Sequence, residues 1–167
     1  SNGGGIYITD GGPYLAHAPD IENSTIAYNH ATGSGGAIYY TFCDAKIDYS
    51  TIVGNTAEGI GPGIYGGSSQ VITVLNNNFS NNGYAVYNSD NTYYSTLVNN
   101  YWGDTTGPYH QTQNPSGQGD SVNYYVNVDP WLTTPNTDAP PIPAQNTTVT
   151  GTGNDFISLD WDASEIG

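Results

Sequence analysis

The chain reads Ser24-Thr25-Ile26-Ala27-Tyr28-Asn29 near its beginning and Ser50-Thr51-Ile52-Val53-Gly54-Asn55 26 residues later. Two further segments, at 74–82 and 97–102, align with this pair after steps of 27 and 23 residues. Self-similarity at a nearly fixed period indicates a repeat architecture. In every copy one apolar residue precedes a second by five positions: Ile21/Ile26, Ile47/Ile52, Val74/Phe79 and Leu97/Trp102.

A second element recurs between these copies and ends in tyrosine each time. A period near 25 residues is too short for helical ankyrin or TPR units, and the leucine-rich pattern is missing. We therefore predict an all-β chain wound as a parallel β-helix, in which each coil stacks its apolar residues on the next. Alternation along each run places isoleucine inward and tyrosine outward. The element reads Gly4-Gly5-Ile6-Tyr7, Gly36-Ala37-Ile38-Tyr39, Gly63-Ile64-Tyr65 and Ala85-Val86-Tyr87.

Asparagine follows the second apolar residue of the repeat by three positions, at Asn29, Asn55 and Asn82. An asparagine amide caps a turn backbone well, and the residue tolerates the left-handed backbone conformation. We expect these side chains to turn the chain at one corner of successive coils. We also expect each amide to hydrogen-bond the asparagine above and below it.

The motif Gly35-Gly36-Ala37-Ile38-Tyr39, taken with Ser-Thr-Ile-x-x-Asn at 24–29 and 50–55, carries a family resemblance. It resembles the right-handed parallel β-helix repeats of pectate-lyase-like and polymorphic-outer-membrane-protein-like surface proteins. The similarity covers the chain from Gly4 to Leu132. Its motif is specific for the fold and says little about activity.

Charge and composition exclude several classes of function. The 167 residues include Lys46 as the single basic residue against 15 acidic ones, a formal net charge of −14. Nucleic-acid binding needs clustered Lys or Arg, so it is excluded, and so is a basic helix on a membrane surface. No apolar run reaches 18 residues, which predicts no membrane insertion. The acidic, Asn/Thr/Tyr-rich balance favours an extracellular or cell-surface location.

Three regions follow from the changes in pattern along the chain. Residues 1–132 are predicted to form the β-helix with a C-terminal cap, whose large side chains cover the last coil. The Pro-rich segment 133–144 is predicted to be an extended linker. Residues 145–167 alternate like the first two strands of a fibronectin type III domain, which they resemble, although that fold needs roughly seven strands. The expected covers of the cap are Trp102, Tyr109, Trp131 and Leu132.

The segment 103–120 also has a functional interpretation. Asp104 and Asp120 are the carboxylates of this loop that could hold calcium, and calcium is the one cofactor that the sequence suggests. The cap interpretation is favoured over a calcium loop, so we expect no cofactor and no metal site.

Candidate catalytic residues are sparse. A pectate-lyase site needs basic residues, and the chain has no Arg and only Lys46. Glu22 and Asp48 share one repeat column, where neighbours lie about 4.8 Å apart, so they are the candidate acid pair of a glycosidase. Two exposed acids in one column are the favoured alternative, and we expect no enzymatic activity.

The remaining reactive side chains suggest no site. The three histidines, His17, His30 and His110, lack metal-ligand spacing and are expected on the surface. Cys43 has no second cysteine to pair with, so no intrachain disulfide or cysteine zinc site can form. We expect it to be a buried, inert thiol.

The recurring tyrosines are the candidate ligand-binding residues. Tyr7, Tyr39, Tyr65 and Tyr87 would form an outward stripe that stacks on sugar rings or packs against another chain. An exposed β-surface that simply suits tyrosine is the alternative. Of the three Asn-x-Ser/Thr sequons, those at Asn23 and Asn78 fall in the repeat and are expected to be inaccessible. Asn146 is the candidate glycosylation site.

These features predict a structural or adhesive β-helix module whose partners are polysaccharides, sister subunits or the rest of a larger surface protein. The sequence begins inside a coil and ends on two strands without partners. Head-to-tail filaments, formed through an open coil end and donated C-terminal strands, would satisfy both. The alternatives are a fragment of a polysaccharide-degrading lyase or glycosidase, or a glycan-binding module.

Overall fold

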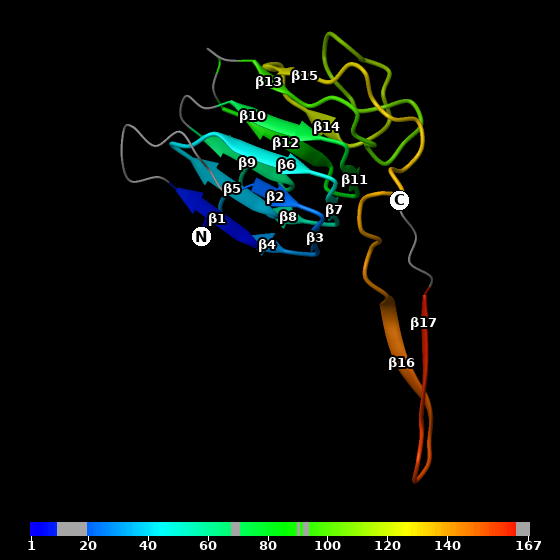
Figure 1. Cartoon of the computed structure of the whole chain (residues 1–167). Helices are drawn as coiled ribbons and strands as arrows, with labels where there is room; N and C mark the ends of the chain where they lie inside the picture. The colour runs from blue at the N-terminus through cyan, green and yellow to red at the C-terminus, as the bar shows by residue number, and fades with distance from the viewer. Residues whose placement is uncertain (10–19, 68–70, 90, 92–93, 163–167) are drawn as a thin grey trace.

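The computed structural model describes residues 1–9, 20–67, 71–89, 91 and 94–162. It confirms a right-handed parallel β-helix whose coils stack in register along one axis (Figure 1). Every regular element of these residues is a strand, and no helix among them is long and apolar enough to cross a membrane. The sequence also predicts a loop insertion between Thr9 and Pro19, which contains Gly11-Gly12-Pro13. Residues 10–19 lie outside the described residues.

The walls of the solenoid are parallel sheets built from strands of successive coils, two with five strands and the third with three. The first wall is β1 (Ile6–Thr9), β5 (Ile38–Thr41), β9 (Ile64–Gly67), β12 (Tyr84–Asn88) and β14 (Ser121–Val122). The second is β2 (Asp20–Glu22), β6 (Ala45–Asp48), β10 (Ile72–Leu75), β13 (Ser95–Thr96) and β15 (Val126–Asn127). The third is β3 (Thr25–Ala27), β7 (Thr51–Val53) and β11 (Asn78–Ser80), beside a short pair of β4 (His30–Ala31) and β8 (Thr56–Ala57).

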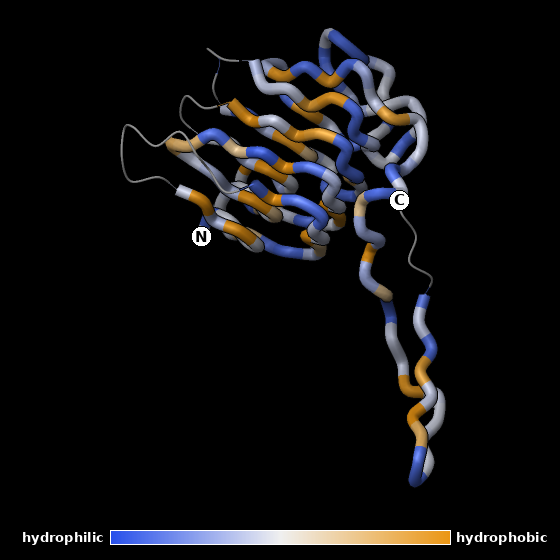
Figure 2. The backbone as a smooth tube through the Cα atoms, viewed as in Figure 1, coloured by the Kyte–Doolittle hydropathy of each residue, from blue (hydrophilic) through white to orange (hydrophobic). Residues whose placement is uncertain are grey.

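Equivalent apolar residues of successive coils lie directly over one another. The column predicted from the repeat is present: Ile26 pairs with Ile52, Ile52 pairs with Phe79, and the Phe79 ring stacks on Trp102 at 4.8 Å. The last three of these side chains are fully buried. Hydrophobic segments recur at the same place on successive coils (Figure 2). Burial of such columns supplies the main stabilising free energy of a solenoid.

The coils turn at three corners, each built from residues in the left-handed conformation. At one corner the left-handed residue is the one directly before Asn29, Asn55 and Asn82. Gly54 makes room for its neighbour: a Cβ there would lie 2.6 Å from the Tyr28 ring. The corner columns are Gly3/Gly35/Gly61/Gly83, Asn23/Tyr49/Asn76/Asn99 and Tyr28/Gly54/Asn81/Gly103.

The predicted asparagine ladder is present inside the corner. The backbone N–H and side-chain Nδ2 of Asn29 both donate to Oδ1 of Asn55, at 3.0 and 3.1 Å. Asn55 donates to Oδ1 of Asn82 in the same way, at 3.1 and 3.0 Å. A second ladder, not predicted, runs from Ser50 through Asn77 to Asn100. These amides satisfy the backbone groups that the turns leave unpaired in the buried core.

The solenoid continues past its predicted last coil, because β14 and β15 add a partial fifth turn. Trp102 therefore belongs to the core rather than to a cover, and Tyr109 is largely exposed, so those two assignments were wrong. Trp131 does pack against the core as a cover. It lies so close to Gly107 that a Cβ on that residue would be 2.5 Å from the indole.

The segment after the cap lies along the solenoid wall instead of standing free as a linker. Asn136 exchanges hydrogen bonds with Asn78, the Pro140 carbonyl accepts from Thr51, and the Pro141 carbonyl accepts from Thr25. Residues 136–142, which we call the strap, thus descend one outer column from the third coil to the first. Ala139 and Ile142 of the strap are buried.

The chain then forms an antiparallel hairpin of β16 (Gln145–Thr152) and β17 (Ile157–Asp162), which projects away from the solenoid (Figure 1). The two predicted strands are therefore present. Ile157, Leu159 and Trp161 alternate along β17 and are all exposed. The resemblance to a fibronectin type III domain stays a prediction.

Removing a rung from the middle of the ladder tests its structural role. Asn55→Ala removes the acceptor of the Asn29 backbone N–H and the Nδ2 donor to the Ile26 and Val53 carbonyls, whereas the backbone N–H of residue 55 still reaches Asn82 Oδ1. Each unsatisfied buried group costs about 1–3 kcal/mol, so we expect the free energy of unfolding to fall by about 2–4 kcal/mol, measured by urea denaturation. Asn29→Ala, at the half-exposed end of the ladder, is the matched control and should cost less. Equal losses for both variants would contradict the ladder's role.

Candidate functional site

The four predicted tyrosines form one continuous column on the outer face of the first wall. Tyr7, Tyr39, Tyr65 and Tyr87 pair in strict register on β1, β5, β9 and β12. Successive ring centroids are 5.2, 5.1 and 5.7 Å apart, with interplanar angles of 1°, 10° and 3°. The neighbouring Ile38 and Ile64 point inward and are fully buried, which confirms the predicted alternation.

The tyrosine column is partly exposed to solvent along its length. Tyr7 is 54% exposed, and the other three rings are half-buried. Burial, followed by the nearby Tyr65 and Tyr7 phenols, raises the pKa of Tyr39, while a hydrogen bond from the Asn2 side chain acts in the opposite direction. A neutral phenol both donates and accepts hydrogen bonds, so the column offers both capacities.

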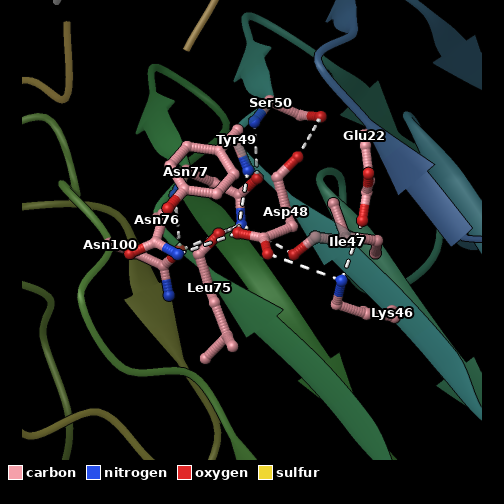
Figure 3. A network of polar contacts seen from close by, with 10 residues as sticks. All are labelled: Glu22, Lys46, Ile47, Asp48, Tyr49, Ser50, Leu75, Asn76, Asn77 and Asn100. Atoms are coloured by element: carbon pink, nitrogen blue, oxygen red, sulfur yellow. Dashed lines mark hydrogen bonds and ion pairs between the residues drawn. The ribbon is translucent and has the colours of Figure 1, made fainter. Parts of the chain in front are cut away.

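The candidate acid pair lies beside Lys46 rather than beside an open face. Glu22 and Asp48 share a register on β2 and β6, as predicted. Lys46 Nζ lies 2.8 Å from Glu22 Oε1 and 3.6 Å from Asp48 Oδ2, between the two carboxylates (Figure 3). The hydrogen bond to Glu22 raises the pKa of Lys46, so the ammonium stays charged. The sequence argument missed this ion pair, although Lys46 stands two positions before Asp48, on the same side of one strand.

Asp48 has structural hydrogen bonds on its other oxygen. Its Oδ1 accepts from the backbone N–H of Tyr49 at 3.1 Å and from Nδ2 of Asn76 at 2.9 Å (Figure 3). Asp48 is buried, which corrects the expectation of two exposed acids, whereas Glu22 is exposed. The Lys46 ammonium and the two N–H donors therefore engage both carboxylate oxygens of Asp48 in structural contacts.

Asp120, the second calcium candidate, ends the asparagine ladder. Its Oδ2 accepts from the backbone N–H and Nδ2 of Asn82 at 3.1 and 2.8 Å, and its Oδ1 accepts from Gly83 N–H at 2.9 Å. Burial raises its pKa, and these hydrogen bonds from Asn82 and Gly83 act against that shift. No spacing rule could find this role, because Asp120 lies 38 residues after Asn82 instead of the usual 26 or 27.

Asp104 has a different and local role. Its Oδ1 accepts from the backbone N–H of Thr106 at 2.8 Å and from the Thr106 hydroxyl at 2.6 Å. The hydroxyl contact, then the N–H contact, lowers the pKa of Asp104. The contacts of Asp104 Oδ1 and of both Asp120 oxygens thus come from N–H and O–H donors of the protein, and calcium binding by these residues stays untested.

The histidines and the cysteine that the structure describes differ in burial and in their hydrogen bonds. His30 is exposed, as predicted; its Nδ1 lies 2.9 Å from the Thr56 hydroxyl. His110 is fully buried, so its predicted surface position was wrong; its Nδ1 accepts from the N–H groups of Thr112 and Gln113. Cys43 is buried as expected, and His17 lies outside the described residues.

The sequons differ in accessibility. Asn78 is buried and bonded to Asn136, as expected, but Asn23 is exposed at a corner, which corrects its predicted inaccessibility. Asn146 is exposed on β16, where its Nδ2 donates to Asp162. Glycosylation of Asn146 stays a prediction.

One family model matches the chain, over residues 6–126, and it is described as "Periplasmic copper-binding protein (NosD)". No curated protein and no solved structure matches. Because the matched residues span well over half of the sequence and comprise the solenoid, the chain belongs to the NosD family.

The residues that the structure describes do not provide the ligands expected for the copper in that description. Copper sites in proteins are built from clustered histidine, cysteine and methionine. The chain has no methionine, and no group of three or more His, Cys, Asp or Glu side chains comes together among the residues that the structure places. Both ring nitrogens of His110 lie within hydrogen-bond distance of protein atoms.

The pH dependence of stability tests the role of Asp120. A folded-state pKa above the unfolded value adds stability below the unfolded pKa, and this stability is lost as the pH rises through the folded pKa. We therefore expect the unfolding free energy of the wild type, relative to Asp120→Asn, to fall between acid and neutral pH in urea titrations. A relative stability that grows with pH would show that the three N–H donors outweigh burial.

Proposed function

We propose that this member of the NosD family is a non-catalytic adhesive scaffold whose tyrosine column is its binding surface. One observation carries the proposal: the column runs unbroken over four coils, with Tyr7 exposed and the other three rings half-buried. Two carboxylates that could take part in catalysis form structural hydrogen bonds instead. Asp48 accepts from Asn76 at a corner, and Asp120 accepts from Asn82 at the end of the ladder. Polysaccharide is the partner that we assign to the column.

We also propose a location outside the cytoplasm, either in a periplasm or on a cell surface. The family description names periplasmic proteins. The net charge of −14 and a composition rich in Asn, Thr and Tyr support the same location. A rigid solenoid suits a rod that holds a binding face away from its attachment point.

Assembly of copies head to tail is the second part of the proposal. Within the described residues, β1, β2, β3 and β4 each pair with another strand on one side only. Unpaired strand edges are templates for association. The exposed apolar side chains of β17 offer a second contact, because a two-stranded hairpin is only marginally stable in water without a partner.

Polysaccharide cleavage is the alternative function, and the shared register of Glu22 and Asp48 favours it. Lys46 between the two carboxylates argues against it, since both carboxylates form ion pairs with the ammonium. A glycosidase pair needs one protonated acid.

Binding and turnover measured in one assay test the adhesive role. We expect the protein to be retained by soluble polysaccharide in affinity electrophoresis, without new reducing ends or unsaturated products after long incubation. Asp48→Asn should bind as the wild type does, because the residue lies away from the tyrosine column. Turnover that Asp48→Asn abolishes would establish the enzyme instead.

Light scattering after size exclusion tests the assembly. We expect the wild-type mass to rise with concentration, and the double variant Leu159→Ser/Trp161→Ser to stay monomeric because its hairpin has lost its apolar side chains. Ser158→Asn, next to Leu159 on β17, is the matched control and should assemble normally. A monomeric wild type at every concentration, or unchanged assembly of the double variant, would refute strand donation.

A further inference from the structure

We infer that the tyrosine column binds a neutral, extended polysaccharide that lies along the solenoid axis and contacts the phenol hydroxyls and ring edges, not the ring faces. This inference rests on the proposed adhesive function and specifies its ligand and its mode of contact.

The ring faces are already covered. Neighbouring tyrosine rings are nearly parallel, at centroid distances of 5.1–5.7 Å, so each inner ring has a tyrosine on both faces. A sugar ring cannot enter between Tyr39 and Tyr65 without separating two hydrogen-bonded strands. The usual stacking of a sugar on an aromatic face is therefore closed to these two residues. What remains accessible is the outer edge of each ring with its hydroxyl.

The hydroxyl groups form a regular ladder. Because the rings are parallel and in register, their hydroxyls repeat at nearly the same spacing as the coils. A ladder of this kind complements a ligand that also repeats along its length and carries both donors and acceptors. Polysaccharides have that chemistry, since each sugar unit carries several hydroxyls. The raised pKa of Tyr39 keeps its phenol protonated, so it keeps its donor.

The charge of the protein selects among polysaccharides. A net charge of −14 repels uronate-rich or sulfated chains, and the single lysine forms ion pairs with Glu22 and Asp48 on another wall. The first wall therefore has no cation to attract an anionic glycan. A neutral chain pays no such electrostatic penalty.

Removing hydroxyls while keeping the rings separates the two modes of contact. In affinity electrophoresis with hydroxyethylcellulose as the probe, we expect Tyr65→Phe/Tyr87→Phe to weaken binding about tenfold or more, as loss of two hydrogen bonds predicts. Tyr65→Ala/Tyr87→Ala should weaken it by at least as much. Tyr28→Phe, at an exposed corner, is the matched control and should bind normally. Urea denaturation verifies that each variant is folded.

The other outcomes have separate meanings. Normal binding by the phenylalanine variant with loss in the alanine variant would overturn the hydroxyl mode and leave the adhesive function standing. Stronger retention by polygalacturonate than by hydroxyethylcellulose would overturn the choice of a neutral ligand. No retention by either polysaccharide would overturn the adhesive function together with this inference.

Discussion

In-register pairing of successive coils is the constraint on which the rest of this structure depends. Parallel strands place each residue beside its counterpart one coil away, so every choice of side chain is repeated along the axis. Ile26, Ile52, Phe79 and Trp102 show the apolar consequence, a buried column whose members widen toward the C-terminal end. A shift of one residue would turn a whole column to the opposite face, which is why the register is kept so strictly.

The same constraint explains why the core tolerates amides. Each asparagine of the ladder donates twice to the next one and keeps its own oxygen for the residue below, so all its polar atoms are used. The amide dipoles then point in one direction along the axis and strengthen one another. Asp120 stands at the acceptor end of this chain, where a carboxylate can take N–H groups without having to donate. Asp120 therefore ends the ladder of hydrogen bonds.

The sequence repeat predicted the features that recur in every coil. It did not predict contacts between residues whose separation along the chain differs from the repeat. The walls, the inward isoleucines, the tyrosine column and the first asparagine ladder follow from equal spacing along the chain. The strap does not, because Asn136 meets Asn78 across 58 residues through contacts that occur once. Buried His110 was also missed, since a loop folded onto itself, not a repeat, removes it from water. The repeat also could not identify the left-handed corner residues, because Asn, Gly and Tyr all occupy these positions and composition gives no common signal.

A side chain repeated once per coil cannot be treated as a set of independent residues. Four separate tyrosines on a flat surface would offer eight ring faces to sugars, whereas stacking at the coil spacing covers the inner faces and leaves edges and hydroxyls. Stacking also holds the rings in place, so little rotamer freedom remains to be lost when a ligand binds. The strap shows that this wall geometry accepts an extended chain: two carbonyls of residues 136–142 accept from the threonine column of successive coils. In the binding mode that we propose, a solenoid wall suits a ligand whose own repeat runs along its axis, and the repeated side chain sets the chemistry of the contact.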